Sequence, residues 1–422
     1  MSLVGIASKR IATCDGARAT REDPLGIVEN GVILYDEHSI SYVGPRSAQT
    51  DKVPVTDYGD RVITPGLVDA HTHSAWVGSR HTEYVMRMAG ADYRAIAAKG
   101  GGILSSAKAI AQATEDQIVV ELALRLKRMS TLGVTTVEVK SGYGLEPEGE
   151  RKQLRAITRT RQERSLPYIV PTYLALHALP PTAARSRDYY VLRAATSLVQ
   201  EFAQQKLAKF VDVYIDQNAF TVEEARLVLE GARRAGLGIR CHVGQFADIG
   251  GAQLCAEFGA RSVDHLENVD AAGIAALAKA DVAATLLPIA SLTLNQAPPP
   301  IEKLRAAGIT FVVASDANPG TAPSESLPLA LALAVRTYGL TPEEALLGGT
   351  RNAAFSLGLA GPGVSRPRGA IAPGARADIV VWDLPHEHAI LQPWGVAKTH
   401  VVLRSGQQIA GRKRDGPGAK AQ

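Results

Sequence analysis

The sequence has few cysteines and lacks any long hydrophobic run. Its three cysteines, Cys14, Cys241 and Cys255, are an odd number without CxxC spacing, which excludes a disulfide framework and fits a reducing compartment. The longest apolar run, 327–335, is interrupted by Pro328 and is too short to cross a bilayer. The first residues show no charged-then-apolar signal pattern. We therefore expect a cytoplasmic protein that does not insert into membranes.

The sequence also lacks a strong excess of either charge. Lys and Arg number 46 and Asp and Glu number 42, which gives a formal net charge of +4 over 422 residues. So small an excess does not favour a nucleic-acid partner. The proportions of 46% hydrophobic and 21% charged residues are those of an ordinary globular protein, and the chain is long enough to bury a large core.

Both ends of the chain are typical of β structure. Residues 31–43 hold two strand-like runs before Gly44 and Pro45, and residues 377–383 and 399–404 form two more near the other end. Neither end carries enough apolar surface for a core of its own, so we expect the two ends to pair. This pairing predicts one small β-sandwich-like domain into which a central domain is inserted.

The middle of the chain alternates strand-like runs with helix-compatible segments such as 115–133 and 222–236. Eight such strands over roughly 300 residues indicate an α/β fold, a (β/α)8 TIM-type barrel. A doubly wound open sheet is the competing architecture, but no GxGxxG follows a strand; the glycines at 100–102 fit a flexible loop and a ligand-facing loop equally well. The expected strands are 62–69, 134–140, 169–177, 210–216, 237–242, 262–266, 282–288 and 310–316. The expected domains are 1–62 with 367–410 (β domain), 63–366 (barrel) and 411–422 (flexible tail).

The most distinctive motif is PGLVDAHTH at 65–73. Residues i and i+2 of a strand point to the same face, so we expect His71 and His73 to point inward together at the end of the first barrel strand. Two imidazoles placed in this way are natural ligands for a zinc-like ion. An HxH pair alone remains a weak signal, because histidines near a strand end are often only polar rim residues.

Three later strands end in residues of compatible chemistry. His242 ends the fifth predicted strand, His265 the sixth and Asp316 the eighth, and active sites of such barrels assemble at these ends. We therefore predict a divalent metal held by His71, His73 and His242, with Asp316 on it or near it. The metal would lower the pKa of a bound water and supply hydroxide. Asp316 can take the water proton, while His265 either donates a proton to the leaving group or only orients its neighbours.

These motifs resemble those of the amidohydrolase superfamily, and more closely those of the imidazolonepropionase family, which opens a five-membered imidazolone ring. The likeness covers essentially the whole chain. Two of its elements, SGYG (141–144) and NPGT (318–321), are not general features of the superfamily. It implies metal-dependent hydrolysis of an imidazolone with a propionate side chain to N-formimidoyl-glutamate, in histidine degradation. The matching motifs are PGLVDAHTH (65–73), GSR (78–80), GGGIL (100–104), TTVEVKSGYGL (135–145), LALHALPP (174–181), VDHLE (263–267), SDANPGT (315–321) and TRNAA (350–354).

The resemblance also implies the composition of the site. One zinc or iron ion per chain would be bound by His71, His73, His242 and Asp316, and the protein would be a homodimer whose small-molecule partner carries a carboxylate. The substrate-contacting positions of the family fall on Arg80, Tyr93, Tyr143, His177, His265 and Asn318.

The chemistry of these residues fits such a substrate. A propionate needs a fixed cation, and Arg80 offers a bidentate fork. Tyr93 and Tyr143 can flank a flat ring and donate hydroxyl hydrogen bonds. The side chain of Asn318 and the amide of Gly320 are candidates for binding a ring or carboxylate oxygen.

Two segments depart from the family pattern. Relatives carry a carboxylate two or three residues after the histidine of strand five, whereas this chain reads HVGQF; Gln245 can position a ring but cannot transfer a proton. The family's LLPGA, followed by an Arg-Glu pair, appears here as LLPIA (286–290) and then LNQ (294–296). Both changes leave the predicted metal ligands intact, but they affect the substrate side.

The identity of the ring therefore stays open. A rival substrate is the thio-oxo analogue 3-(5-oxo-2-thioxoimidazolidin-4-yl)propionate, which hydroxide would convert to hydantoin-5-propionate and sulfide, because hydrosulfide departs with little help from an acid. The overall likeness favours imidazolone ring opening. A third hypothesis is a non-catalytic binding protein whose barrel has lost its catalytic site. It is disfavoured because all four candidate metal ligands are present.

Overall fold

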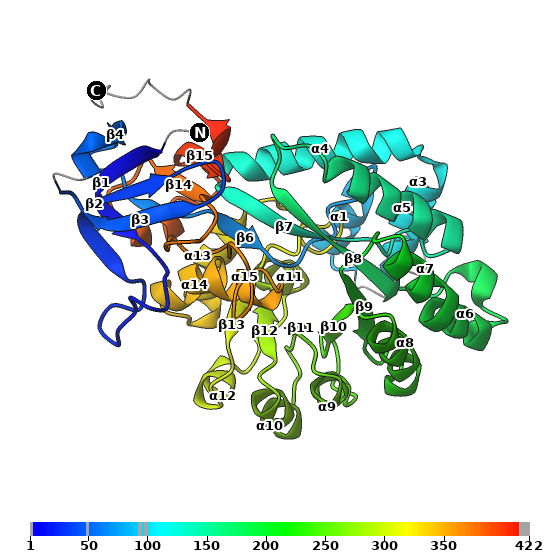
Figure 1. Cartoon of the computed structure of the whole chain (residues 1–422). Helices are drawn as coiled ribbons and strands as arrows, with labels where there is room; N and C mark the ends of the chain where they lie inside the picture. The colour runs from blue at the N-terminus through cyan, green and yellow to red at the C-terminus, as the bar shows by residue number, and fades with distance from the viewer. Residues whose placement is uncertain (1–2, 48–49, 92–94, 97–99, 413–422) are drawn as a thin grey trace.

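Eight parallel strands form a barrel at the centre of the molecule (Figure 1). The structure is a computed structural model, and it describes residues 3–47, 50–91, 95–96 and 100–412. Strands that follow one another along the chain lie side by side, and each such pair is parallel. The barrel strands are β6 (Leu67–Asp69), β7 (Val134–Lys140), β8 (Tyr168–Leu176), β9 (Phe210–Ile215), β10 (Gly238–Val243), β11 (Ser262–His265), β12 (Ala283–Leu286) and β13 (Phe311–Val313).

The first and last barrel strands, β6 and β13, meet just beyond their C-terminal ends. Thr72 forms a parallel bridge with Ala317. The amide of His73 donates to the carbonyl of Ala317 at 3.0 Å, and the amide of Asp316 donates to the carbonyl of His71 at 3.1 Å. Backbone pairing at the closure of the barrel therefore places the HTH motif beside Asp316.

A second sheet, built from both ends of the chain, lies beside the barrel (Figure 1). Its strand order is β16-β15-β14-β5-β1-β2-β3, with β4 pairing to β1. The antiparallel pairing of β14 with β5 joins the C-terminal segment to the N-terminal one. The strands are β1 (Val4–Ala12), β2 (Ile27–Tyr35), β3 (Ile40–Pro45), β4 (Val55–Asp57), β5 (Ile63–Pro65), β14 (Ile379–Trp382), β15 (Thr399–Arg404) and β16 (Gln407–Gly411).

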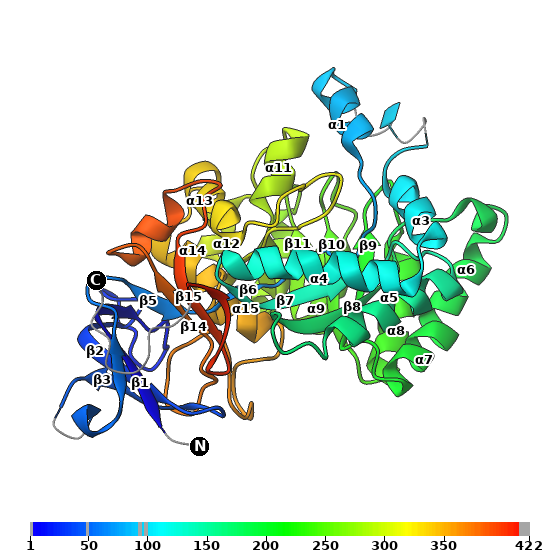
Figure 2. The ribbon, with the colours of Figure 1, turned by 90° about the horizontal axis from the view of Figure 1, so that it is seen from above.

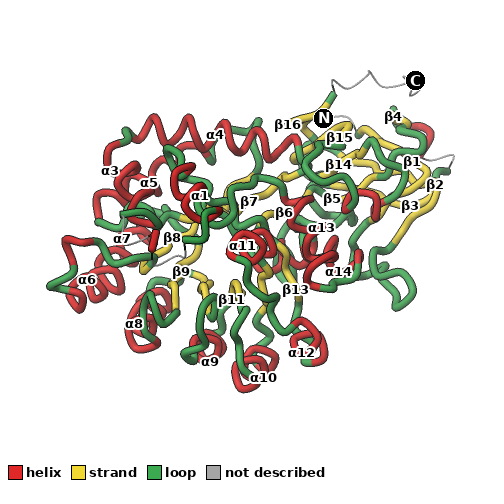
Figure 3. The backbone as a smooth tube through the Cα atoms, turned by 180° about the vertical axis from the view of Figure 1, so that it is seen from behind, coloured by secondary structure: helices red, strands yellow, loops and turns green. Residues whose placement is uncertain are grey.

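Helices surround the barrel, and α8, α9, α10 and α12 follow one another around its strands in the view from behind (Figure 3). Helix α1 projects beyond the other helices (Figure 2). Three helices begin with a capping box at Thr114, Thr221 and Thr341, whose hydroxyls accept from the amide three residues on. Among the described residues, no helix is long and apolar enough to span a membrane. The α-helices are α1 (His81–Met88), α3 (Ile103–Gln112), α4 (Glu115–Thr131), α5 (Pro147–Thr160), α6 (Arg187–Arg193), α7 (Val199–Gln204), α8 (Val222–Arg234), α9 (Gly251–Glu257), α10 (Ala271–Lys279), α11 (Pro288–Leu294), α12 (Ile301–Ala306), α13 (Leu327–Tyr338), α14 (Pro342–Gly348) and α15 (Arg351–Ser356). Shorter helical turns are η1 (Thr50–Lys52), η2 (Pro181–Ala183), η3 (Ala194–Leu198) and η4 (Glu387–Leu391).

The predicted fold class, a (β/α)8 barrel with a small β unit made from both chain ends, is confirmed. The first predicted strand, 62–69, differs in one respect, because it is two strands: β5 belongs to the small sheet and β6 to the barrel. The exact domain boundaries stay a prediction, and residues 413–422 of the predicted flexible tail lie outside the described residues.

The break between β5 and β6 falls at Gly66. The amide of Gly66 donates to the carbonyl of Asp378, which precedes β14, at 2.9 Å. A Cβ atom at residue 66 would lie 2.1 Å from Oγ1 of Thr135, a buried residue of β7. Only glycine lets the chain pass from the small sheet into the barrel this close to β7.

We expect Gly66→Ala to destabilise the protein by about 1–3 kcal/mol, because the added methyl overlaps the buried side chain of Thr135. The midpoint of urea unfolding measures the change. Gly16→Ala is the matched control, since its Cβ would approach only the flexible guanidinium of Arg351, at 3.2 Å. A midpoint for Gly66→Ala equal to that of the wild type would contradict the close packing at this crossing.

Candidate functional site

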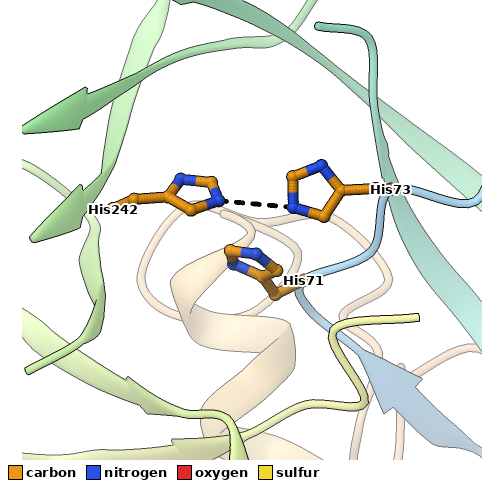
Figure 4. A group of neighbouring side chains, drawn as sticks. All are labelled: His71, His73 and His242. Carbon is orange, nitrogen blue, oxygen red and sulfur yellow. Dashed lines mark hydrogen bonds between the residues drawn. The ribbon is translucent and has the colours of Figure 1, made fainter. Parts of the chain in front are cut away.

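Three histidines converge at the C-terminal ends of the barrel strands (Figure 4). His71 and His73 follow β6, and His242 lies on β10. The Nε2 atoms of His73 and His242 are 3.3 Å apart. Oδ1 of Asp316 lies 3.5 Å from Nε2 of both His71 and His73. The structure thus brings together the four predicted metal ligands, all of them buried.

The protonation of these groups suits a metal ion. Burial lowers the pKa of His71, His73 and His242 well below the ordinary value, so the rings are neutral at pH 7; the neutral ring is the form that binds metals. Burial raises the pKa of Asp316 to about 7. Nε2 of His71 is buried and has no hydrogen-bond partner among the described residues. An orphaned nitrogen pointing at other donor atoms fits a divalent cation.

Two carboxylates behind the histidines fix how the rings are oriented. Nδ1 of His71 lies 2.7 Å from Oδ2 of Asp264, and Nδ1 of His242 lies 3.0 Å from Oδ1 of Asp212. A carboxylate only accepts, so each Nδ1 carries the proton and each Nε2 presents its lone pair to the centre of the site.

Both carboxylates belong to a fully buried layer of charges beneath the histidines. Nζ of Lys140 donates to Glu138 at 2.9 Å and to Asp212 at 2.7 Å, and lies 3.8 Å from Asp264. Burial disfavours the ammonium form, but these carboxylates outweigh that cost and raise the pKa of Lys140. Arg240 lies 3.5 Å from the other oxygen of Asp264. Lys140 is thus engaged by three carboxylates, and the layer holds both carboxylates that orient the histidines.

His265 occupies an unusual backbone position at the end of β11. Its φ is 82°, in the left-handed region, and that of Asp316 is 54°; such conformations cost energy and often mark functional sites. Nδ1 of His265 lies 3.6 Å from Oε2 of Glu267. Burial opposes protonation, but Glu267 and Asp316 outweigh it and raise the pKa of His265. The ring is therefore well suited to carry a proton near neutral pH.

A cavity opens above the predicted metal ligands and is lined by several of the predicted substrate contacts. Arg80, Tyr143, His177 and Gln245 line it, together with His265. Nδ1 of His177 lies 2.9 Å from the carbonyl of Gly142, so this nitrogen donates and Nε2 is left as an acceptor. Burial lowers the pKa of His177 to about 4, which keeps the ring neutral. Tyr93 lies outside the described residues.

Arg80 already has a partner inside the site. Nε and Nη2 donate to Oε2 of Glu83, one turn along α1, at 2.8 and 2.6 Å. The guanidinium also lies against the backbone of Gly320, where a Cβ would come within 2.3 Å of Nη1. Glu83 and Gly320 therefore fix the orientation of the guanidinium, while Nη1 makes no hydrogen bond within the described part of the chain.

Asn318 and Gly320, two predicted substrate contacts, hydrogen-bond to each other within their own loop. Oδ1 of Asn318 accepts from the amides of Gly320 and Thr321 at 2.8 and 2.7 Å, and Nδ2 donates to the carbonyl of Asp316 at 2.8 Å. Asn318 borders the cavity, but its amide group is used to fold its own loop. The Gly320 amide is occupied in the same way, so the geometry does not support it as a substrate-binding donor.

The two segments that depart from the family pattern touch each other. Nε2 of Gln296, just beyond α11, donates to the backbone carbonyl of Gln245 at 2.8 Å. The hydroxyl of Tyr214 donates to Oε1 of Gln245 at 2.8 Å, which leaves the NH2 group for the cavity. Asp316 is the one carboxylate among the described residues that line this cavity.

Sequence reasoning missed several residues that complete the site. The cavity is also lined by Ile103, Tyr214, Phe246 and Thr321. Ile103, Phe246 and Thr321 lie within the GGGIL, HVGQF and SDANPGT segments, but their side chains were not singled out there. No motif contains Tyr214. The buried charges did carry a signal, because Glu138, Lys140, Asp212, Arg240 and Asp264 interrupt otherwise apolar strands. A charge inside a buried parallel strand needs a partner, and that need points to a shared polar layer.

Comparison with known proteins gives a consistent picture. Residues 62–411 match the amidohydrolase family. The chain is 42% identical over 408 residues to an imidazolonepropionase of Chromobacterium violaceum, with 95% of this chain and 96% of that protein covered. It is 40% identical over 388 residues to an imidazolonepropionase of Mesorhizobium japonicum, with 91% and 93% covered.

Solved structures share the fold at much lower identity. Guanine deaminase from E. coli matches with a TM-score of 0.72 at 14% identity and covers 98% of this chain and 100% of that one. A zinc-bound adenosine deaminase from Xanthomonas campestris matches with a TM-score of 0.69 at 17% identity, covering 96% and 92%. At this distance the likeness concerns the architecture alone.

We expect Asp264→Asn to weaken the binding of a divalent metal roughly 10–100-fold, because Nδ1 of His71 loses a charged acceptor. Competition with a chelator, followed by elemental analysis of the protein, measures the affinity. Asp60→Asn is the control, since Asp60 pairs with Lys9 on the exposed surface. An unchanged affinity in a folded Asp264→Asn protein would contradict the role assigned to this carboxylate.

Proposed function

The chain belongs to the amidohydrolase family and, within it, to the imidazolonepropionases, and from this membership we propose the reaction that it carries out. It is a metal-dependent hydrolase that opens the five-membered ring of imidazolone propionate to N-formimidoyl-glutamate, in histidine degradation. Water adds to the ring carbonyl carbon, the adjacent ring C–N bond breaks, and the nitrogen leaves with a proton. The observation that carries the proposal is the convergence of three histidine Nε2 atoms and Asp316 at the floor of a polar cavity.

We propose one zinc or iron ion per chain, held by His71, His73, His242 and Asp316. A divalent ion in such a site lowers the pKa of water and provides a hydroxide nucleophile at neutral pH. The engagement of Lys140 by three carboxylates supports a single ion, because this lysine is not free to form the carbamate that bridges two metals.

Two residues are proposed to move protons. The second carboxylate oxygen of Asp316 accepts the proton of the nucleophilic water. His265, whose Nδ1 lies 3.6 Å from Oε2 of Glu267, donates from Nε2 to the departing ring nitrogen. The nearby carboxylates of Glu267 and Asp316 raise the pKa of His265, which favours its protonated form.

Substrate recognition is proposed to come from the wall of the cavity. The fixed guanidinium of Arg80 binds the propionate through Nη1, and Glu83 keeps it in place. His177 accepts a hydrogen bond from a ring N–H at its Nε2, while Tyr143 packs against the flat ring. The NH2 group of Gln245, turned inward by Tyr214, donates to an acceptor of the ring.

A second candidate substrate is favoured by one observation. Where relatives have a carboxylate, this cavity presents the amide of Gln245, and the lining includes no carboxylate besides Asp316 among the described residues. Such a site is poor in acids for a nitrogen leaving group, but it suffices for hydrosulfide. The alternative reaction is desulfurisation of 3-(5-oxo-2-thioxoimidazolidin-4-yl)propionate to hydantoin-5-propionate and sulfide.

We further propose that the protein works in the cytoplasm as a homodimer. Its three cysteines are free and buried, which suits a reducing compartment. The family likeness supports the dimer.

Incubating one enzyme preparation with imidazolone propionate and with its thio-oxo analogue distinguishes the two reactions. We expect N-formimidoyl-glutamate from the imidazolone, and we expect His265→Ala to abolish nearly all of this turnover, because no other acid serves the ring nitrogen. His38→Ala, on an exposed turn, is the control. Sulfide release from the thio-oxo compound without any ring opening would overturn the first proposal in favour of the second.

We expect Arg80→Ala to reduce kcat/KM for the propionate substrate by roughly 30-fold, equivalent to about 2 kcal/mol, through loss of a desolvated charge-assisted pair. An analogue without the carboxylate should lose far less. Glu83→Gln retains the guanidinium and is expected to cause a smaller loss than Arg80→Ala. Equal losses on both substrates would show that Arg80 supports the fold instead of binding the propionate.

A further inference from the structure

A second polar cavity lies between the small sheet and the barrel, far from the metal-binding histidines. It has a volume of about 370 Å³. Tyr168, the first residue of β8, lines it, so the cavity opens at the N-terminal end of the barrel strands. The histidines lie at the opposite, C-terminal end. No step of the proposed reaction uses this cavity.

Arginine dominates the lining of the second cavity. Arg164, Arg368, Arg376 and Arg404 all border it, whereas Glu37 is the one carboxylate among the described lining residues. Two of these guanidinium groups lie over one aromatic ring: the central carbon of Arg368 lies 4.4 Å from the centroid of Tyr168, and that of Arg404 lies 5.8 Å away.

Two of the four arginines have structural partners. Arg368 forms a buried ion pair with Asp378. Nη1 of Arg404 donates to the carbonyls of Glu163 and Leu166 at 3.1 and 2.6 Å. The contacts of Arg404 connect the small sheet to the loop that precedes β8. Arg368 and Arg404 therefore both have a structural role.

The other two arginines have none. The side chains of Arg164 and Arg376 make no hydrogen bond or ion pair with any part of the chain that the structure describes. Arg376 is half-buried; burial lowers its pKa, and the neighbouring charges of Arg368 and Arg366 add to the effect. Arg164 is exposed, but keeping the half-buried guanidinium of Arg376 beside the charges of Arg368 and Arg366 costs free energy, and a bound anion reduces that cost.

We propose that this cavity is a binding site for a small polyanion with at least two negative charges on phosphate or carboxylate groups, which Arg164 and Arg376 bind through their guanidinium forks. A planar guanidinium group can form two parallel hydrogen bonds with either a phosphate or a carboxylate. The volume suits a small ligand of several heavy atoms. The bound anion would touch the β2–β3 turn, the start of β8 and the end of β15, and would thereby link the small sheet to the barrel.

Calorimetric titration of the full-length, metal-loaded protein with pyrophosphate tests the proposal at physiological ionic strength. We expect saturable binding that the double variant Arg164→Gln/Arg376→Gln weakens by at least about tenfold. Arg185→Gln is the matched control, because Arg185 is an exposed arginine before α6; its affinity should equal that of the wild type. A parallel titration with glutarate, a dicarboxylate, shows which of the two anion classes the site prefers.

Three outcomes would overturn the proposal: no saturation up to about 10 mM of either anion, equal affinity in the double variant and the wild type, or an equal loss in Arg185→Gln. Pyrophosphate bound at the catalytic metal would give the second outcome. Hydrolysis of the ring substrate at the other end of the barrel serves as the folding check, and the double variant should retain it. The binding result stands apart from the proposed function, because it does not depend on which ring the enzyme opens.

Discussion

The site depends on one buried lysine. Nζ of Lys140 is fully buried and lies within 3.8 Å of Glu138, Asp212 and Asp264. Burying three carboxylates without a counterion is prohibitively costly. The lysine makes it possible to keep two of them, Asp212 and Asp264, ionised directly behind the histidines. They in turn fix the tautomers of His71 and His242, so the geometry of these two predicted metal ligands originates one layer below them.

The same layer also holds the strands together. Oε2 of Glu138 accepts from the backbone amide of Thr72 at 3.1 Å, and Arg240 donates to the carbonyl of Ala70 at 2.9 Å. Side chains from β7 and β10 thus bind the backbone on either side of His71. An apolar core of similar volume is often as stable as a buried ionic network or more stable. What the charges contribute here is a fixed position for the chain segment that carries His71 and His73, the first two predicted ligands.

Much of the site was predictable from the sequence, because it follows from strand geometry. The i, i+2 spacing of His71 and His73 and the strand-end positions of His242, His265 and Asp316 place all five residues at one end of a barrel. Other features depend on tertiary contacts that no spacing reveals.

Asn318 was predicted to bind substrate, yet its amide folds the loop, because both of its polar ends find backbone partners within four residues. The predicted strand 62–69 shows no break in its hydrophobic pattern, yet the structure divides it at Gly66 into β5 and β6. Only the close approach of β7 explains this division. The link between Gln245 and Gln296 joins two segments 51 residues apart.

The pairing of β5 with β14 has a consequence for synthesis. Strand β5 lies directly before β6, the first barrel strand, and it acquires β14 as a neighbour only when Ile379–Trp382 has left the ribosome. On a chain made from its N-terminus, the small sheet that precedes the first barrel strand is therefore completed only after all eight barrel strands have been made.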